Sequence, residues 1–359
     1  MKKTAAVAIV FLIQINCLFA QSSPAARFID SFANKNIFNG TVLIEQKGKI
    51  TYNKSFGYAN FQFKVPNTLE TKYKIASITK LFTSVLVMQL SEQGKLDINK
   101  TIGNYLPGYK GEGVDKVTVH QLLNHTSGIA NMDTVTSVES ALKNGLPVYQ
   151  QPITSEELLT RFCSGRLVNT PGKAFDYNNA EYIILGKIIE KISGKPYEQV
   201  VKENILQPLQ MKNSGPLYQH EITAGLADTY FYRDDIKKLV PDLPVYSENW
   251  YAAGSMYSTV NDLSLFTRAL FGLKLLKQES LDKMFVSGLG EYGYGVWVYE
   301  NYGINNKMYK IIKRPGQIMG AQGMLFHILE DGSTIIILSN TGTTSLDDFA
   351  AEIAVKIVR

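Results

Sequence analysis

The sequence has little of what several protein classes require. It contains two cysteines among 359 residues, too few for a disulfide framework. Its net charge is +5, from 37 lysines and arginines against 32 acidic residues, so no excess of one sign points to nucleic acid as a partner. No Gly-X-Y period is present, and 45% of the residues are hydrophobic, which excludes a collagen-like fibre and a disordered chain. A folded globular protein remains.

The longest apolar run lies at the N-terminus. Two lysines precede an apolar stretch that ends near Ala20, a pattern typical of a secretory signal peptide. The run is interrupted by Gln14 and Asn16 and is shorter than the roughly 20 apolar residues of a membrane span. We therefore predict that residues 1–20 are a cleaved signal peptide, that no membrane span remains after cleavage, and that the protein is exported to the periplasm or secreted.

Two other interpretations of this segment stay open. One is a membrane anchor, and the other is lipid attachment at Cys17, although the residues before it, 14–16, lack the small side chains of such a site. Cleavage would leave a net charge of +3 and Cys163 as the single cysteine, hence no internal disulfide. The mature chain must then rely on a buried apolar core, which a chain of this length can provide.

Strand patterns occupy both ends of the remaining chain, and helical patterns occupy its middle. Runs of β-branched residues bounded by turn signals predict strands within residues 37–58 and 295–339. Apolar residues at helical spacing predict helices over 77–93, 118–124, 154–163, 180–192, 260–270, 278–285 and 346–358. The two groups of strands are therefore expected to meet in one sheet.

Residues 21–359 are predicted to form a single domain, because no linker, low-complexity tract or repeat interrupts them. We predict an α+β fold, in which an antiparallel sheet from both chain ends, about 28–72 and 286–359, is flanked by helices. The helical part, about 73–285, is an insertion into this sheet. The active site is expected in the crevice between the two parts.

A Ser-x-x-Lys pair opens the longest predicted helix of the middle region. Three helical steps turn Lys80 about 60° from Ser77 and advance it by roughly 4.5 Å, so both side chains share one face. A serine hydroxyl needs a group that takes its proton, and a lysine whose pKa is lowered by burial or nearby positive charge can do so. Backbone N–H groups at the helix start can bind an oxyanion. We predict Ser77 as the nucleophile and Lys80 as its base.

The tetrapeptide alone is not specific, because it recurs at Ser140–Lys143 and Ser280–Lys283. Both repeats are expected on exposed helix surfaces, since Ser140 stands in a polar stretch and Ser280 follows a glutamine and a glutamate. Only Ser77 begins a long apolar helix and follows a mainly apolar segment, residues 73–76. The context therefore selects Ser77.

Ordered segments extend the pattern well beyond one tetrapeptide. They are Phe56–Asn60, Ile75–Lys80, Leu122–Gly128, Pro171–Tyr182 and Ala252–Thr259. With these segments, the chain from about residue 37 to 340 resembles the serine β-lactamase-like family. That family includes class C β-lactamases, D-alanyl-D-alanine carboxypeptidases, penicillin-binding proteins and related esterases, and the resemblance implies their fold.

Tyr177-Asn178-Asn179 resembles the family's Tyr-x-Asn element. The resemblance implies that Tyr177 moves the proton between the serine and the leaving group, and that Asn179 holds the substrate amide and Lys80. A tyrosine near Lys80 would also experience a positive charge that favours its phenolate, and Asn179 offers both a donor and an acceptor. The structural alternative is that Tyr177 packs and Asn179 caps a helix beginning at Ala180.

The third sequence element of the family differs in this chain. Relatives carry Lys-Thr-Gly or His-x-Gly on a strand that lines the cleft, and the best match here is Arg314-Pro315-Gly316. The resemblance implies that Gly316 lets the substrate lie against the strand, and that the N–H of Gln317 completes the oxyanion hole with that of Ser77. Arg314 cannot release its proton, so it would bind a substrate carboxylate or hold the electrostatic field around Lys80. The alternative is a surface arginine beside a turn.

Other catalytic chemistries lack their signatures. The four histidines, His120, His125, His220 and His327, do not have the spacing of a zinc site, and His125 is expected to structure its turn. There is no Gly-x-Ser-x-Gly elbow and no phosphate-binding glycine loop. We expect neither a metal nor an organic cofactor.

The sequence therefore predicts an exported serine hydrolase that forms an acyl-enzyme at Ser77. The resemblance implies D-Ala-terminated peptidoglycan peptides, β-lactams or small esters as substrates; the oligomeric state is not predicted. Because Arg314 replaces the family's Lys or His, a second hypothesis is a penicillin-recognising or peptide-binding protein with slow or lost turnover.

Overall fold

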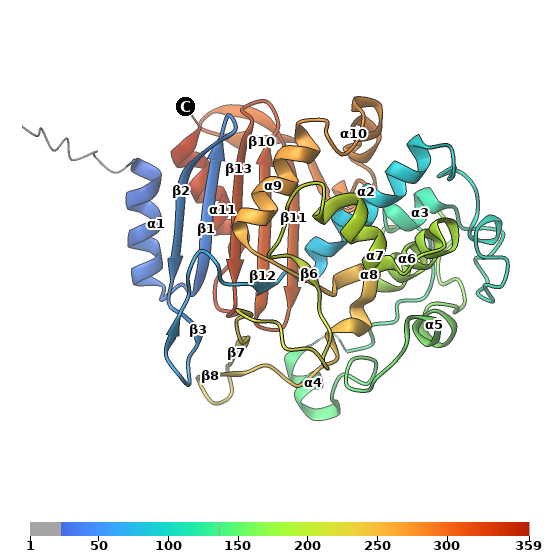
Figure 1. Ribbon diagram of the computed structural model, residues 1–359, viewed down its shortest axis with the longest axis horizontal. Helices are drawn as coiled ribbons and strands as arrows, with labels where there is room; N and C mark the ends of the chain where they lie inside the picture. Colours follow the sequence, from blue (N-terminus) through green and yellow to red (C-terminus); the bar gives the residue numbers. More distant parts are fainter. Residues whose placement is uncertain (1–22, 136, 359) are drawn as a thin grey trace, which may run out of the picture.

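Both ends of the chain build one antiparallel sheet, seen at the left of Figure 1 in blue and red. The computed structural model describes residues 23–135 and 137–358, so the predicted signal peptide, with Cys17, lies outside the described residues. The strand order is β10–β11–β12–β13–β1–β2. The strands are β1 (Gly40–Gln46), β2 (Lys49–Phe56), β10 (Trp297–Ile304), β11 (Lys307–Ile318), β12 (Ala321–Ile328) and β13 (Ser333–Ser339). The predicted α+β fold is confirmed.

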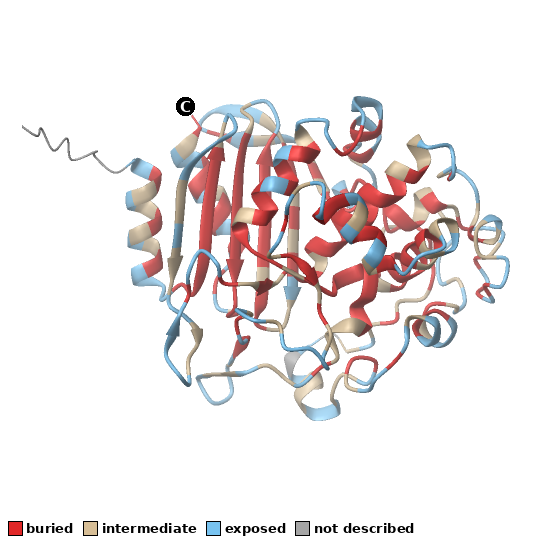
Figure 2. Cartoon of the chain, viewed as in Figure 1, coloured by how far each residue is buried: buried red, intermediate tan, exposed pale blue. Residues whose placement is uncertain are grey.

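Helices cover both faces of this sheet. On one face, α1 (Pro24–Lys35) packs against α11 (Leu346–Ile357), and together with the sheet they enclose one apolar core. On the other face, α9 (Val260–Phe271) lies on β1 and β13, and a second, larger core continues from there into the helical part. Strand β13 is buried along its whole length, which explains its unbroken apolar run (Figure 2). Helix α1, which Ser23 caps and a proline opens, was not predicted from the sequence.

The helical part is built around α2 (Thr79–Glu92), which contacts α6 (Asn179–Ser193) and α8 (Tyr251–Gly254). Most residues of α2 are buried on every side, so it is a core helix rather than a surface helix. The other helices are α3 (Val119–Leu123), α4 (Val138–Asn144), α5 (Ser155–Glu157), α7 (Tyr197–Val201) and α10 (Gln278–Met284). Short strands join the parts: β3 (Tyr58–Asn60) with β4 (Val65–Pro66), β5 (Tyr73–Lys74) with β9 (Met256–Ser258) and β6 (Gly215–Pro216), and β7 (Tyr230–Arg233) with β8 (Lys238–Pro241).

Two element boundaries differ from the predictions in ways that matter for the site. The helix predicted over 77–93 begins as a 3₁₀ turn, Ala76–Ile78 (η1), which leads directly into α2 and carries Ser77. Strand β11 runs six residues beyond the predicted 308–312, as far as Ile318, and so includes the Arg314-Pro315-Gly316 element. Pro315 is tolerated there because the strand has an open edge at this point.

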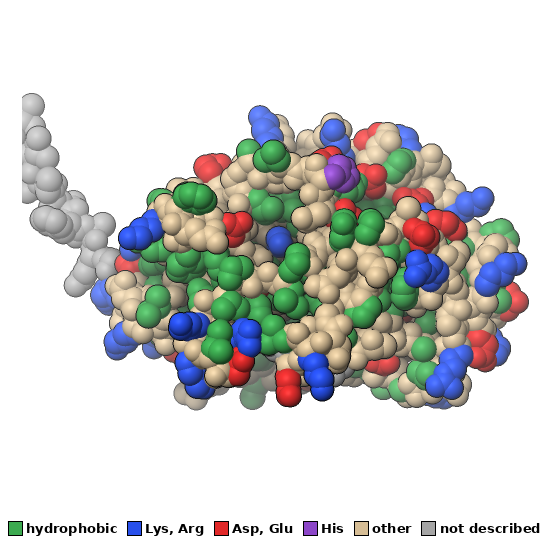
Figure 3. Space-filling view, turned by 90° about the horizontal axis from the view of Figure 1, so that it is seen from below, with side chains coloured by type: hydrophobic (Ala, Val, Ile, Leu, Met, Phe, Trp, Pro, Cys, Tyr) green, Lys and Arg blue, Asp and Glu red, His purple; other side chains and the backbone are tan. Residues whose placement is uncertain are grey.

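The surface shows no broad region of one charge on the face seen in Figure 3. Basic and acidic side chains lie interspersed around its edge, and hydrophobic side chains gather toward its middle. Among the described residues, no helix combines the length and the apolar character that crossing a bilayer requires.

Candidate active site

The turn that carries Ser77 lies against an open edge of the sheet. Strand β10 pairs with β11 only as far as Lys313, so within the described chain the following residues of β11 pair with β12 alone. The turn η1 packs against this stretch. A Cβ atom on Gly316 would lie 2.4 Å from the carbonyl oxygen of Ile75 and 3.1 Å from the backbone nitrogen of Ser77. Gly316 therefore makes room for the backbone of Ser77, in addition to lining the cleft.

The backbone immediately before Ser77 is strained. Ala76 adopts a left-handed φ of 47°, which costs an L-residue roughly 1–2 kcal/mol. The strain turns the chain sharply between β5 and α2 and leaves Ser77 partly exposed at the start of a long helix. Such outliers persist only where the surrounding structure enforces them, and here the packing of η1 on β11 does so.

Lys80 is fully buried and contacts three polar atoms. Its Nζ lies 3.1 Å from Ser77 Oγ, 2.6 Å from Asn179 Oδ1 and 2.9 Å from the carbonyl oxygen of Ala253 in α8. Burial lowers the pKa of Lys80, and the charge of Arg314 lowers it further, while Tyr177 and Asp133 oppose this. The predicted pair of Ser77 and Lys80 is thus within hydrogen-bonding distance.

Tyr177 reaches the same serine from the other side. Its hydroxyl lies 2.9 Å from Ser77 Oγ, and its ring lies 4.8 Å below Lys80 Nζ. Burial raises the pKa of Tyr177, but Arg314 and Lys80 together with hydrogen bonds outweigh this and lower it to about 8. Tyr177 is therefore more easily ionised than an ordinary tyrosine.

Arg314 lies behind Tyr177 with 1% of its surface exposed. Its guanidinium donates three hydrogen bonds, each 2.7 Å long. Nε donates to the carbonyl oxygen of Ser77, Nη1 to the hydroxyl of Tyr292 and Nη2 to the hydroxyl of Tyr177. The interpretation as a surface arginine is wrong. Of the two functional roles predicted, the geometry fits the electrostatic one, because the guanidinium faces the interior and not the cleft.

Asn179 links Lys80 to an acidic side chain. Its Oδ1 accepts from Lys80, and its Nδ2 donates to Asp133 Oδ2 at 2.7 Å. Asp133 also accepts a hydrogen bond from Tyr149. Capping of α6, the alternative proposed for Asn179, is performed by Asn178, whose Oδ1 accepts from the N–H of Ala180 at 2.9 Å. Sequence reasoning missed Asp133, which lies in a loop and belongs to no motif.

The hydrogen-bond network holds two proton arrangements with the same heavy atoms. In one, a neutral Lys80 donates to Asn179 and Ala253 and accepts from the Ser77 hydroxyl, while Tyr177 donates to Ser77. In the other, a charged Lys80 donates to all three atoms, and Ser77 donates to a Tyr177 phenolate that Arg314 stabilises. The serine proton has an acceptor in both arrangements.

A buried His–Glu pair forms the floor under Tyr177. His125 has a left-handed φ of 58°, its Nδ1 contacts Glu181, and its ring centroid lies 4.4 Å from that of Tyr177. Burial raises the pKa of Glu181 well above its ordinary value and lowers that of His125 well below its own, so burial favours the neutral form of both groups. His125 lies behind the tyrosine, in agreement with the structural role expected for it.

A cleft of about 460 Å³ opens in front of Ser77. Ser77, Tyr177, Trp297, Gly316 and Gln317 line it, and the ring of Trp297 stacks on that of Tyr177 with centroids 5.7 Å apart. Gln317 is exposed on β11 beside Gly316. Its N–H as an oxyanion donor, together with that of Ser77, stays a prediction.

The two other Ser-x-x-Lys sequences have different surroundings. Ser140 Oγ accepts from the amide of Asn144 at 3.2 Å, and Lys143 is exposed. Ser280 is 6% exposed, so the expectation that it lies on a solvated face is wrong, but Lys283 is exposed. Neither pair has the buried lysine that lowers a pKa by desolvation.

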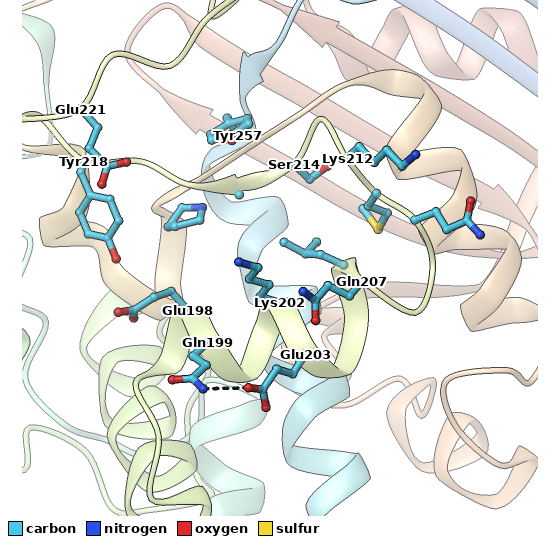
Figure 4. Close-up of a pocket in the computed structure, with 15 residues that line it drawn as sticks. Glu198, Gln199, Lys202, Glu203, Gln207, Lys212, Ser214, Tyr218, Glu221 and Tyr257 are labelled. Carbon is cyan, nitrogen blue, oxygen red and sulfur yellow. Dashed lines mark hydrogen bonds between the residues drawn. The ribbon is translucent and has the colours of Figure 1, made fainter.

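A larger cavity lies elsewhere. It measures about 840 Å³ and is lined by side chains of both charges, among them Glu198, Lys202 and Glu221, with Tyr218 and Tyr257 (Figure 4). The acidic Glu203 on its wall already accepts from Gln199, and none of the predicted site residues borders it. Within the part of the chain that the structure describes, no group of three metal-binding side chains converges.

Comparisons with known proteins show which family the chain belongs to. The Beta-lactamase family model matches residues 25–358. The putative penicillin-binding protein PbpX of Bacillus subtilis is 30% identical over 315 residues, which cover 86% of this chain and 72% of that protein. The teichoic acid D-alanine hydrolase of Staphylococcus aureus is 26% identical over 247 residues, which cover 68% of this chain and 57% of that protein.

Among solved structures, a penicillin-binding protein from Bacillus halodurans is similar with a TM-score of 0.77 and 26% sequence identity. The match covers 90% of this chain and 98% of that protein. The family and these relatives indicate a hydrolase. With a family model matched over nearly all described residues and the predicted fold confirmed, the chain belongs to the Beta-lactamase family.

Proposed function

We propose that the protein is an exported serine hydrolase that forms an acyl-enzyme at Ser77. One observation carries the proposal: Ser77 Oγ lies 3.1 Å from the buried Lys80 Nζ and 2.9 Å from the Tyr177 hydroxyl, two groups whose pKa values are both lowered. Such an arrangement activates a serine at neutral pH. Export is supported by the N-terminal apolar segment of the sequence.

In the acylation step, Ser77 Oγ attacks the substrate carbonyl carbon and its proton passes to Lys80 or Tyr177. The oxyanion is held by the backbone N–H groups of Ser77 and Gln317. The bond to the leaving group breaks, and the leaving group takes the proton that the serine gave up. In deacylation, water gives a proton to the Lys80–Tyr177 pair as its oxygen attacks the acyl carbon, the acid departs, and the pair passes that proton to Ser77 Oγ. No metal or organic cofactor takes part.

D-Ala-containing peptides, β-lactams and small esters are the substrate classes that we propose from the family. The relative named a teichoic acid D-alanine hydrolase adds D-alanyl esters to them. All four carry a carbonyl whose acyl group can be transferred to a serine hydroxyl. The proposed partner is thus a small molecule or a cell-wall component.

Active-site labelling tests the proposal. The purified mature protein would be incubated with a fluorophosphonate and, separately, with a fluorescent penicillin, and the labelled peptide identified by mass spectrometry. We expect labelling at Ser77 and its loss in Ser77→Ala, whose melting temperature stays near that of the wild type because a partly exposed hydroxyl is removed. Failure of both reagents to label Ser77 would overturn the proposal.

The second candidate is a penicillin-recognising protein that acylates and stalls. Arg314 favours it, because an arginine that never releases its proton stands where relatives carry Lys or His. Release of product from p-nitrophenyl acetate in a burst, without a steady phase, would support this candidate. Continued turnover would support the hydrolase.

A further inference from the structure

A second pocket lies beside α8, away from the cleft at Ser77. It measures about 450 Å³, and it shares Glu198 and Tyr218 with the larger cavity, where Figure 4 shows both side chains. Among the described residues, none borders both this pocket and the cleft. We call it the α8 pocket; its walls include Glu190, Tyr197, Glu198, Tyr218, Glu248 and Tyr251.

The α8 pocket carries negative charge that no cation balances. Three glutamates line it, and the described part of its wall contains no lysine or arginine. Glu190 pairs with Lys187 at 2.6 Å and is therefore compensated. Glu198 and Glu248 are half-buried, and within the described chain neither forms an ion pair; Glu248 accepts only from the backbone N–H of Gln219. Partly desolvated carboxylates without a counter-charge favour a cationic ligand.

Aromatic rings surround these carboxylates. Tyr197, Tyr218 and Tyr251 line the pocket, and the ring centroids of Tyr197 and Tyr251 lie 5.2 Å apart. Burial raises the pKa of Tyr218, and the charges of Glu198 and Glu248 raise it further, so both carboxylates lie close to this ring. Tyrosine faces attract ammonium groups through the ring quadrupole. The walls therefore combine two features that favour an organic cation.

The hydroxyl of Tyr251 is an independent sign of a missing ligand. The residue is 8% exposed, and its Oη has no hydrogen-bond partner among the described residues. Glu190 lies close enough to add to the effect of burial, which raises the pKa of Tyr251, but not in hydrogen-bonding geometry. Gly186 of α6 makes room for the ring, because a Cβ there would lie 2.5 Å from Tyr251 Cε1. A buried polar group held in this way without a partner is unusual.

We propose that the α8 pocket binds a small organic ammonium ion, held by Glu198 and Glu248, with the Tyr251 hydroxyl as a further acceptor. A divalent metal fits less well, because no three metal-binding side chains converge in the described part of the chain. The pocket is a second site, and the proposal does not depend on the chemistry of Ser77.

A cation and its neutral counterpart test this assignment. Binding of benzylamine and of benzyl alcohol to the purified protein would be measured by isothermal titration calorimetry at pH 7 in low salt, where the amine is protonated and its charge is little screened. The two probes have nearly the same shape. Because hydrogen bonds to charged groups are roughly twice as strong as neutral ones, we expect the amine to bind at least about tenfold more tightly.

Variants locate the binding. In Glu198→Gln/Glu248→Gln the ratio of the two affinities should fall toward one, and Glu198→Gln alone should have part of this effect. Both changes keep a hydrogen-bond acceptor and remove only the charge. Glu279→Gln, at an exposed position on α10, is the matched control and should leave the ratio unchanged.

Tyr251→Phe probes the hydroxyl separately. It should weaken amine binding about two- to tenfold, the usual effect of one hydrogen bond. It should not lower the melting temperature of the free protein, because the hydroxyl that it removes has no partner among the described residues.

Two outcomes would overturn the inference. One is equal binding, or no binding, of the two probes to the wild type. The other is an unchanged affinity ratio in Glu198→Gln/Glu248→Gln, which would show that the amine binds at another site. Melting temperatures of all variants would confirm that a lost preference reflects the pocket and not unfolding.

Discussion

The guanidinium of Arg314 donates to the hydroxyl of Tyr177 at 2.7 Å, and that hydroxyl lies 2.9 Å from Ser77 Oγ. The arginine charge therefore acts on Ser77 through Tyr177. This explains how a side chain that cannot exchange its proton can stand in the position where the family resemblance implies a Lys or His. It stabilises the phenolate form of Tyr177 and, by repulsion, the neutral form of Lys80.

Removing the arginine charge should move the pH profile to higher pH. With the pKa of Tyr177 lowered to about 8, kcat/KM of the wild type should rise with pH and level off above about 8, as the Lys80–Tyr177 pair loses one proton. Arg314→Gln removes the largest of the causes that lower this pKa, so the rising limb should shift upward by about one unit or more. Activity at pH 7 then falls about tenfold.

Arg314→Lys is the control for this shift, because it keeps the charge while losing the forked geometry. Its rising limb should lie between those of the wild type and Arg314→Gln. Rates of p-nitrophenyl acetate hydrolysis from pH 6 to 10 provide the measurement. If the rising part of the pH profile lies at the same pH in all three proteins, Arg314 does not lower the pKa of the Lys80–Tyr177 pair.

Replacing Lys80 by methionine should slow acylation strongly. The change keeps most of the side-chain volume but removes the proton acceptor of Ser77 and leaves Asn179 Oδ1 and the Ala253 carbonyl without their partner. We expect fluorophosphonate labelling at Ser77 to slow by about 10²–10⁴-fold, the usual contribution of a general base. The matched variants Lys143→Met and Lys283→Met, which change the exposed lysines of the two other Ser-x-x-Lys sequences, should label at the wild-type rate.

The sequence predicted the parts of this site that local spacing determines. Ser77 and Lys80 lie one helical turn apart, a spacing that the sequence shows directly, whereas Tyr177 and Asn179, at the start of α6, were identified from their resemblance to the family's Tyr-x-Asn element. Strand β13 and the limits of α9 were also found within a residue, because their apolar patterns are unbroken. These features need no knowledge of the rest of the chain.

Features that depend on long-range packing could not be predicted. Whether Arg314 faces the cleft or the interior is decided by the position of Tyr292 and by the turn before Ser77, neither of which its neighbours in sequence indicate. Asp133 reaches the site from a loop without a motif. Helix α1 was missed because its stability comes from packing on α11, which lies at the other end of the chain.

A side chain at position 316 should disturb the turn that carries the nucleophile. In Gly316→Ala the new Cβ would lie 2.4 Å from the Ile75 carbonyl oxygen, closer than any ordinary contact, so β11 or η1 must shift. Because displacements near 1 Å cost catalysis about 10²-fold, we expect a loss of this order in kcat/KM, with a stability loss of about 1–3 kcal/mol.

The matched control is Gly303→Ala in β10, where the nearest heavy atom, Met308 Sδ, would lie 3.9 Å from the new Cβ. Ester hydrolysis and thermal unfolding of both variants would be compared. Equal activities for Gly316→Ala and Gly303→Ala would mean that the turn tolerates displacement.

The buried Glu181 should make the protein less stable as pH rises. Burial raises its pKa well above the ordinary value, so the folded protein keeps a proton that the unfolded chain releases above about pH 4.5. Stability from this group is therefore present in full at low pH and is lost at about 1.4 kcal/mol per pH unit until the folded pKa is reached.

Glu181→Gln isolates this contribution, because an uncharged amide can still accept from the Ser127 N–H and donate to His125. The difference in unfolding free energy between the variant and the wild type, measured by urea denaturation from pH 5 to 8, should grow in favour of the variant with increasing pH. The His125 term, which lowers stability below about pH 6.5, is common to both proteins and cancels. The control is Glu279→Gln, at an exposed position on α10, whose unfolding free energy should change with pH in parallel with that of the wild type. If the unfolding free energy of Glu181→Gln also ran parallel to that of the wild type, Glu181 would be ionised in the folded protein.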